Sequence, residues 1–214
     1  KEDSVVVEST PTPTPAKKAT ATPTVAADAQ NTTYTSKDKS VAIKLPDATW
    51  SNKSDSDDMV SFESPDQGKL LVLHGSGDEA MSVAIIPSSQ DTASALVKAD
   101  NLVEGTDFEI QDYKSEEVSG VNVYSYTVHY LNDKSEYAYV VNKYFTDNTT
   151  EFYSVAGSVK KEDSLAKIKA SVDSFKIAGE SGLKAATPET GSSAAGTENT
   201  GTADGTVASG TTAD

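Results

Sequence analysis

The chain contains no cysteine and no arginine among its 214 residues, so all 18 of its basic residues are lysines. Without cysteine, the chain can form no disulfide framework, thiolate zinc site or cysteine nucleophile. Because arginine is the usual bidentate partner of phosphate, its absence argues against nucleotide and nucleic-acid binding. A formal net charge of −15 would also repel a phosphate backbone. We therefore expect no nucleic-acid partner, and nothing in the sequence points to a cofactor.

Long apolar runs are missing too, and no segment approaches the length of a membrane span. Residues 1–32 are rich in Thr, Pro and Ala, and residues 179–214 are rich in Gly, Thr, Ser and Ala. Neither segment has enough apolar surface to offset the entropy of ordering its backbone. We expect a disordered tether over 1–32, one folded domain over 33–178 and a disordered tail over 179–214.

The beginning of the chain suggests where the protein works. The first residue is Lys1, and the Thr/Pro-rich tether follows at once. This arrangement is typical of a secreted chain whose signal peptide and lipid-modified cysteine precede it. We expect an extracellular lipoprotein of the bacterial cell surface, a monomer that touches the membrane only through that anchor.

The order of apolar patterns predicts an α+β fold. Strands are expected at 41–45, 59–64, 69–75, 81–87, 107–118, 120–131, 136–146 and 150–159. A helix should begin at Asp91 and end at Gly105, and a second helix should cover 161–174. Because strands and helices do not alternate, we expect an antiparallel sheet of six or more strands. Both faces of the later strands carry apolar residues, so helices or loops should cover both faces.

Four segments carry a family resemblance. They are "SVAIKLPDATW" at 40–50, "FESPDQG" at 62–68, "GVNVYSYTVHY" at 120–130 and "YSVAGSVKKEDSLAKIKASVDSF" at 153–175. Together they resemble the PsbP-like domain of bacterial surface lipoproteins. The resemblance implies a sheet flanked by helices in an α/β/α sandwich. Proteins of this fold are mostly non-enzymatic binding or assembly factors with different partners, so it implies a non-catalytic domain and leaves the partner open.

His74 offers an alternative, a hydrolase-type enzyme. It lies in "LHGSGDE", close in sequence to Ser76 and Asp78, but a triad needs these side chains to hydrogen-bond one another. A plain glycine-rich turn is the other interpretation, because Ser76 lacks the Gly-x-Ser-x-Gly elbow. His129 lies on a predicted strand, either as a satisfied sheet histidine or as a metal ligand or proton switch.

An acidic cluster offers another alternative, a weak calcium-responsive module. Asp55, Asp57 and Asp58 in "SDSDD" would supply oxygen ligands if they converged, but the EF-hand spacing fails. Such carboxylates, like those near His74, could also serve an enzyme. A solvated acidic loop is the simpler interpretation.

Tyrosines are concentrated in one part of the chain, with eight of nine between 113 and 153. Five are candidates for binding a protein or cell-wall glycan partner: Tyr124, Tyr126, Tyr130, Tyr137 and Tyr139. We expect the first three to share one face of a strand and the last two to share a face of the next. Alternatively, all five pack the sheet and keep their hydroxyls at a wet edge.

The only tryptophan, Trp50, follows the first predicted strand and Pro46. It could be a ligand platform, an active-site wall or a core anchor. We favour the anchor, with the indole N–H bonded to a backbone carbonyl or to water.

Overall fold

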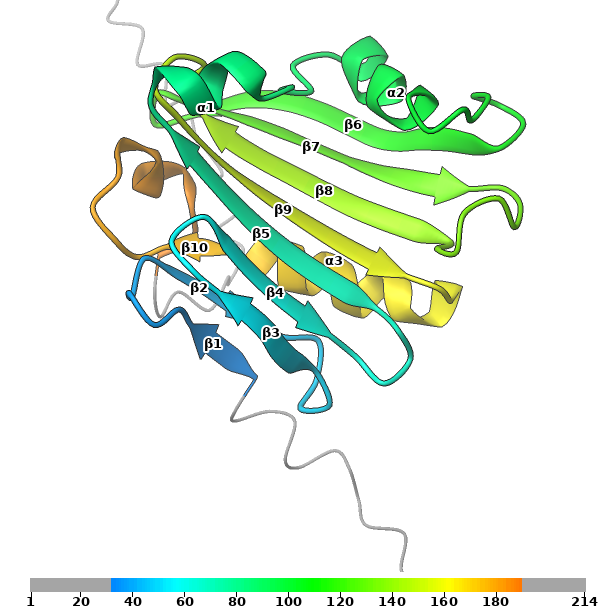
Figure 1. Ribbon diagram of the computed structural model, residues 1–214, viewed down its shortest axis with the longest axis horizontal. Coiled ribbons are helices and arrows are strands. Elements are labelled where there is room, and N and C mark those ends of the chain that lie inside the picture. The colour runs from blue at the N-terminus through cyan, green and yellow to red at the C-terminus, as the bar shows by residue number, and fades with distance from the viewer. Residues whose placement is uncertain (1–31, 190–214) are drawn as a thin grey trace, which may run out of the picture.

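Two antiparallel sheets of unequal size organise residues 32–189, the part of the chain that the computed structural model describes (Figure 1). The smaller sheet has the order β1-β2-β10. Its strands are β1 (Thr33–Thr35), β2 (Val41–Lys44) and β10 (Lys176–Ile177). The sheet therefore joins the beginning and the end of the described chain.

The larger sheet has seven strands in the order β3-β4-β5-β9-β8-β7-β6, with every neighbouring pair antiparallel. Its strands are β3 (Ser51–Asp55), β4 (Met59–Glu63), β5 (Lys69–Ser76), β6 (Phe108–Val118), β7 (Val121–Tyr130), β8 (Tyr139–Thr146) and β9 (Glu151–Val159). The predicted α+β class and antiparallel sheet of six or more strands are confirmed. Within that sheet, the four strands expected between 107 and 159 correspond to β6 to β9.

Helix α3 (Leu165–Ser174), preceded by the short 3₁₀ helix η1 (Glu162–Ser164), covers one face of the large sheet. Its Ile168 and Val172, four residues apart, lie on one side of the helix and are buried against the sheet. The close approach requires Gly157 on β9, because a Cβ atom there would stand 2.4 Å from Ile168 Cγ1. The small sheet packs on the same side, with Val41 and Ile177 in the same core cluster.

Helices α1 (Asp78–Val83) and α2 (Gln90–Lys98) lie on the opposite face (Figure 1). Ala93 and Val97 of α2 form a second core cluster with Phe108, Tyr126 and Val128 of β6 and β7. The large sheet is therefore covered on both faces, as the apolar pattern predicted. No helix among residues 32–189 is both long and apolar enough to cross a membrane.

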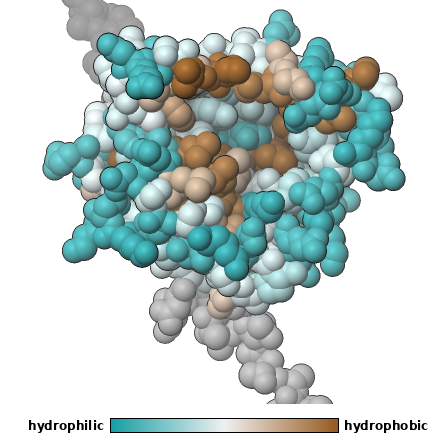
Figure 2. All heavy atoms as spheres, viewed as in Figure 1, coloured by the Kyte–Doolittle hydropathy of each residue, from teal (hydrophilic) through white to brown (hydrophobic). Residues whose placement is uncertain are grey.

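The strand expected at 81–87 is wrong. Its first residues form the end of α1, and the rest has no regular structure. Val83 and Ile85 are 76% and 61% exposed, and Figure 2 shows apolar side chains gathered over the segment between α1 and α2. Their β-branched side chains suggested a strand, but they have no pleated neighbour to pack against.

The limits expected for the middle helix are also wrong. The helix is capped by Ser89, whose hydroxyl accepts a hydrogen bond from the backbone N–H of Thr92 at 3.2 Å. It ends at Lys98, and Gly105 lies in the following loop with a φ of +83°. The segment "NKSDSDD" at 52–58, which includes the acidic cluster and was expected to be a loop, is one only in part, because residues 52–55 belong to edge strand β3, where side chains are largely exposed and carry no hydrophobic alternation.

The disordered tail was predicted to begin at residue 179, but the residues that directly follow this position are folded. Residues 182–186 form the 3₁₀ helix η2 (Gly182–Ala186), and Leu183 is 2% exposed within the main core. The buried Leu183, with hydrogen bonds from Ser181 to Glu151 and from the backbone N–H of Ile177 to Thr187, thus holds a segment whose composition predicts disorder. The disorder predicted for residues 1–31 and 190–214 lies outside the described residues.

Candidate functional site

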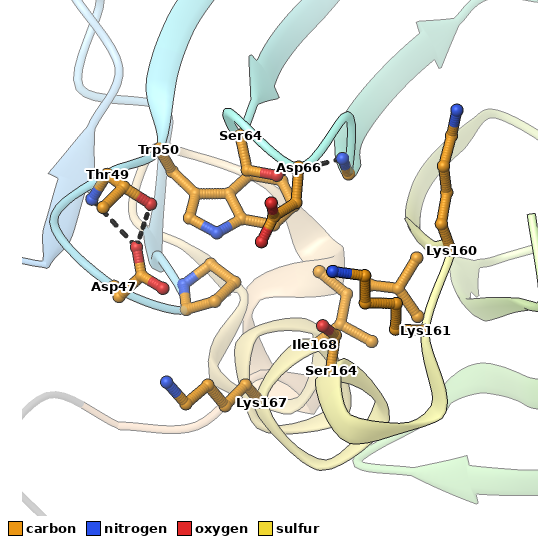
Figure 3. Close-up of a pocket in the computed structure, with 13 residues that line it drawn as sticks. Asp47, Thr49, Trp50, Ser64, Asp66, Lys160, Lys161, Ser164, Lys167 and Ile168 are labelled. Atoms are coloured by element: carbon orange, nitrogen blue, oxygen red, sulfur yellow. Dashed lines mark hydrogen bonds between the residues drawn. The ribbon is translucent and has the colours of Figure 1, made fainter.

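Trp50 lies in a cleft at one end of the large sheet, where four segments of the chain meet (Figure 3). These segments are the loop before β3, the β4–β5 turn, the end of β9 and the beginning of α3. The lining residues are Pro46, Asp47, Thr49, Trp50, Ser64, Asp66, Gly68, Val159, Lys160, Lys161, Ser164, Lys167 and Ile168. Residues more than 100 positions apart in the sequence therefore contribute to one cleft.

Local turn chemistry positions the indole. Asp47 accepts hydrogen bonds from the backbone N–H and the hydroxyl of Thr49, the first at 2.8 Å, which turns the chain just before Trp50. Below the ring, the β4–β5 turn is closed by hydrogen bonds between Ser64 and Gly68. Gly68 lies so close that a Cβ atom there would stand 2.8 Å from Trp50 Cη2. The ring is thus supported by backbone on one side.

The indole combines core packing with access to the cleft. Trp50 is half-buried and packs against the main core cluster, as an anchor would. Its Nε1 makes no hydrogen bond to another residue within 32–189, where no buried side-chain nitrogen or oxygen lacks a partner. The expected bond to a backbone carbonyl is therefore not found there. The N–H is a donor open to solvent or ligand.

Charge is distributed unevenly around the cavity, which has a volume of about 60 Å³. The ammonium group of Lys160 already has partners, because its Nζ lies 3.8 Å from Glu136 Oε2 and donates a hydrogen bond to Gln67 Oε1. Lys161 and Lys167 are exposed, and neither has a carboxylate within 4.0 Å among residues 32–189. In Figure 3 the ammonium group of Lys161 points into the cleft. The cleft can therefore present cationic donors beside an aromatic ring.

His74 pairs with a different residue from those expected. Its Nε2 lies 2.8 Å from Glu151 Oε1, and its ring stacks on Tyr153 with centroids 4.2 Å apart. The other carboxylate oxygen of Glu151 accepts a hydrogen bond from the Ser181 hydroxyl at 2.8 Å. Neither Ser76 nor Asp78 hydrogen-bonds His74 in the described part of the chain. The triad considered as an alternative is not assembled among the described residues.

His129 occupies a similar setting on β7, on the same face of the sheet as His74. Its Nδ1 lies 3.0 Å from Glu109 Oε1, and its ring stacks on Tyr139 at 4.5 Å between centroids. Hydrogen bonds from His129 and then Gln111 lower the pKa of Glu109. The geometry is that of a sheet histidine with a satisfied ring nitrogen.

The three aspartates of the acidic cluster do not converge. Asp55 accepts hydrogen bonds from the Tyr34 hydroxyl at 2.5 Å and from the backbone N–H of Lys37 at 3.1 Å, while Asp57 and Asp58 lie in the turn that follows. Burial, and then the bond to Asp55, raise the pKa of Tyr34 to about 12. Residues 32–189 contain no group of three His, Cys, Asp or Glu side chains placed to hold a metal ion. The convergence that a calcium site requires is absent from this part of the chain.

The candidate tyrosines are divided between two faces. Tyr124, Tyr126 and Tyr130 share the α2 face of β7, as the alternation predicted, but the first two are buried. Burial raises the pKa of Tyr126. Tyr139 is buried on the opposite face against His129, while Tyr137 precedes β8 and is half-buried. These side chains do not form one surface, and most of them pack the sheet.

Sequence reasoning missed the lysines of the Trp50 cleft. Lys160, Lys161 and Lys167 stand more than 100 positions after Trp50, and the pairing of β5 with β9 together with the packing of α3 on Gly157 brings them close. The sequence offers only a weak local signal for them, the pair Lys160 and Lys161 directly before the last helix.

Comparison with known proteins finds only distant similarity. No family model matches the chain, and no curated protein matches its sequence. Among solved structures, it is similar to cyanobacterial PsbP (CyanoP) from Synechocystis sp. PCC 6803, with 14% identity, a TM-score of 0.47, and coverage of 68% of this chain and 91% of that one. A protein from Bacteroides thetaiotaomicron VPI-5482 gives 11% identity, a TM-score of 0.39, and coverage of 71% of this chain and 50% of that one.

The architecture expected from the sequence, an antiparallel sheet flanked by helices, is confirmed. Similarity as distant as that to the solved structures carries no further argument, so function has to be argued from the site.

Proposed function

We propose that this chain is a non-catalytic binding domain that works at the bacterial cell surface, and that the Trp50 cleft is its ligand site. One observation carries the proposal. The only tryptophan of the chain is half-buried beside a cavity, with an N–H that no residue within 32–189 accepts. An aromatic ring with a polar edge is a common element of binding sites, because it offers apolar contact and a directed donor together.

The size of the cavity indicates how a ligand would lie. About 60 Å³ holds one small group, far less than a drug-sized or cofactor-sized molecule needs. The rest of the ligand would lie over the indole and the rim of the cleft. This arrangement suits one end or one unit of a larger envelope component.

The non-catalytic part of the proposal is supported by the two histidines. Each has a ring nitrogen within hydrogen-bond distance of a glutamate and stacks on a tyrosine. Ser181 donates to Glu151 and not to His74, so this serine is not aligned with a base as nucleophilic catalysis requires. We interpret both histidines as side chains that link neighbouring strands of the sheet.

The location at the cell surface is supported by composition. The Thr/Pro/Ala-rich residues 1–32 suit a spacer between an anchor and a domain, and residues 1–31 lie outside the described part of the chain. A lipobox cysteine in the precursor directly before Lys1 is the expected finding. A precursor without a signal peptide would contradict the surface location.

Co-sedimentation of the full chain with isolated bacterial envelopes tests the function. The wild-type chain should sediment with the envelope, and Trp50→Ala should lose most of this binding. Val83→Ala is the matched control, because Val83 is 76% exposed and lies away from the cleft. Circular dichroism confirms that each variant is folded. Equal sedimentation of Trp50→Ala and wild type would refute the site, and no sedimentation of wild type would refute the function.

A further inference from the structure

We infer that the ligand of the Trp50 cleft is an anionic carbohydrate, a sugar that carries a phosphate or carboxylate group. The inference rests on the proposed function and names the ligand class for the same site. It follows from three features of the lining: Lys161 without a carboxylate within 4.0 Å among residues 32–189, Asp47 on the opposite rim, and the indole between them (Figure 3).

Lys161 and Lys167 bring cationic groups to the cleft of an acidic chain. The formal net charge is −15, yet the cleft is lined by three lysines and two aspartates. Lys161 and Lys167 have no carboxylate within 4.0 Å among residues 32–189, a property that they share with other exposed lysines such as Lys37 and Lys184. An ammonium group without an acidic neighbour attracts an anion and can donate up to three hydrogen bonds to it.

Ser164 adds a neutral donor beside these lysines. Its hydroxyl lines the cleft at the beginning of α3, and its side chain makes no capping hydrogen bond to the helix. Lys161 and Ser164 lie on the same side of the cleft in Figure 3. A phosphate or carboxylate oxygen could therefore accept from an ammonium group and a hydroxyl together.

The acidic rim indicates what the rest of the ligand carries. Asp47 and Thr49 lie across the cleft from Lys161, and Asp66 lies beside the indole (Figure 3). These carboxylates would repel a bare anion but accept hydrogen bonds from hydroxyl groups. A ligand with hydroxyls at one end and an anionic group at the other matches both sides of the cleft.

The indole completes the match with a sugar ring. Its ring lies between Lys161 and the Asp47 side, and its N–H is an additional donor. The apolar C–H face of a sugar packs on such a surface, while the cavity of about 60 Å³ accommodates the anionic group. Neither a neutral sugar nor an inorganic anion would use the whole lining.

Trp50 is the only tryptophan, so the tryptophan fluorescence of the full chain reports on this cleft. The probes are glucose 6-phosphate, glucuronic acid, glucose and inorganic phosphate. Glucose 6-phosphate or glucuronic acid should change the emission saturably, with affinity at least about tenfold above that of glucose and of phosphate. The response should weaken as salt is added, because the lysines are exposed to solvent.

The variant Lys161→Gln/Lys167→Gln should lower the affinity for the anionic sugar by about tenfold or more. The matched control, Lys37→Gln/Lys184→Gln, removes the same charge at two exposed positions outside the cleft and should leave the affinity unchanged. Solubilised envelope glycan that competes with the bound sugar identifies a polymer as the source. A lack of competition, with the anionic sugar still bound, identifies a free sugar acid or sugar phosphate.

The contradicting results are separate from those of the envelope experiment. Glucose binding as tightly as glucose 6-phosphate would overturn the anionic class and leave the Trp50 site standing. Phosphate binding as tightly as glucose 6-phosphate would overturn the sugar. Unchanged affinity in Lys161→Gln/Lys167→Gln would overturn the role of the lysines. No response to any probe, while Trp50→Ala still loses envelope binding, would overturn the whole inference without touching the proposed function.

Discussion

The ring edge of Trp50 rests on the backbone of Gly68, so closely that a Cβ atom at position 68 would stand 2.8 Å from Cη2 and 3.0 Å from Cζ2. Real Cβ atoms essentially never approach within 3.0 Å, so a larger residue would have to move the indole. The contact fixes the ring from the hairpin side and leaves its polar edge toward the cleft (Figure 3). The width of the site thus depends on the absence of one side chain.

Gly68→Ala should push the indole into the cleft. We expect the chain to lose about 1–3 kcal/mol of stability, the usual cost of overpacking, and to lose ligand response along with it. Urea denaturation and Trp50 emission measure the two effects. Gly182→Ala is the control, because a Cβ atom there meets nothing within 4 Å. An unchanged emission spectrum in Gly68→Ala would contradict the packing described for the ring.

Trp50→Ala should destabilise the chain only moderately. The ring packs against the core but is half-buried, so the loss should fall below the about 3–5 kcal/mol of a fully buried large side chain. Trp50→Phe should recover most of the stability while still lacking the N–H donor. Chemical denaturation gives both values. If Trp50→Ala lost about 3–5 kcal/mol of stability and still bound the envelope, the role of Trp50 would be purely structural.

Leu183→Ala should destabilise the whole domain, although the residue belongs to a Gly/Ala-rich segment. Leu183 is 2% exposed in the main core, and truncation of such a leucine costs about 2–5 kcal/mol. The neighbouring Lys184→Ala, at an exposed position of η2, should change little. Thermal melting compares the two variants. Equal melting temperatures would show that the domain ends before η2.

Acid should weaken the fold partly through Asp107. Its buried carboxylate accepts hydrogen bonds from Lys134, Asn132 and the backbone N–H of Val103, which lower its pKa from 3.8 to about 2. Because the folded state binds the proton more weakly than the unfolded state, this contribution is complete above about pH 4 and is lost as the pH falls through about 2.

Asp107→Asn should therefore lower stability near neutral pH and flatten the stability profile between about pH 4 and 2. Urea midpoints measured across this range test the prediction. Asp163→Asn, at an exposed position of η1, is the control and should keep the wild-type slope. An unchanged slope in Asp107→Asn would show that other carboxylates dominate acid unfolding.

The sequence predicts most of the fold where hydrophobic periodicity reflects burial. Strands β6 to β9 and helix α3 were predicted because their buried faces alternate or repeat in the chain itself. Several elements were not predicted, among them β1, β10 and α1. Edge strand β3 is held by backbone pairing and has few buried side chains, while the exposed Val83 and Ile85 imitate a strand without being one.

The candidate site was predictable only in part. Trp50 could be singled out because it is the only tryptophan. The lysines could not, because the packing of Ile168 on Gly157 helps to bring the start of α3 beside the indole, and Lys161 and Lys167 with it. No local pattern encodes such a long-range contact. For the tyrosines, the local pattern was right but the burial was not predicted, since Tyr124 and Tyr126 share a face as expected and yet are buried.

The most direct test of the Trp50 cleft as ligand site is the indole N–H resonance of the full chain. A single tryptophan gives a single indole cross-peak in a proton–nitrogen correlation spectrum. On addition of solubilised envelope glycan, this peak should shift saturably, together with the backbone amides of Gly68 and Ser164. An indole peak that stays in place while amides elsewhere shift would contradict the site.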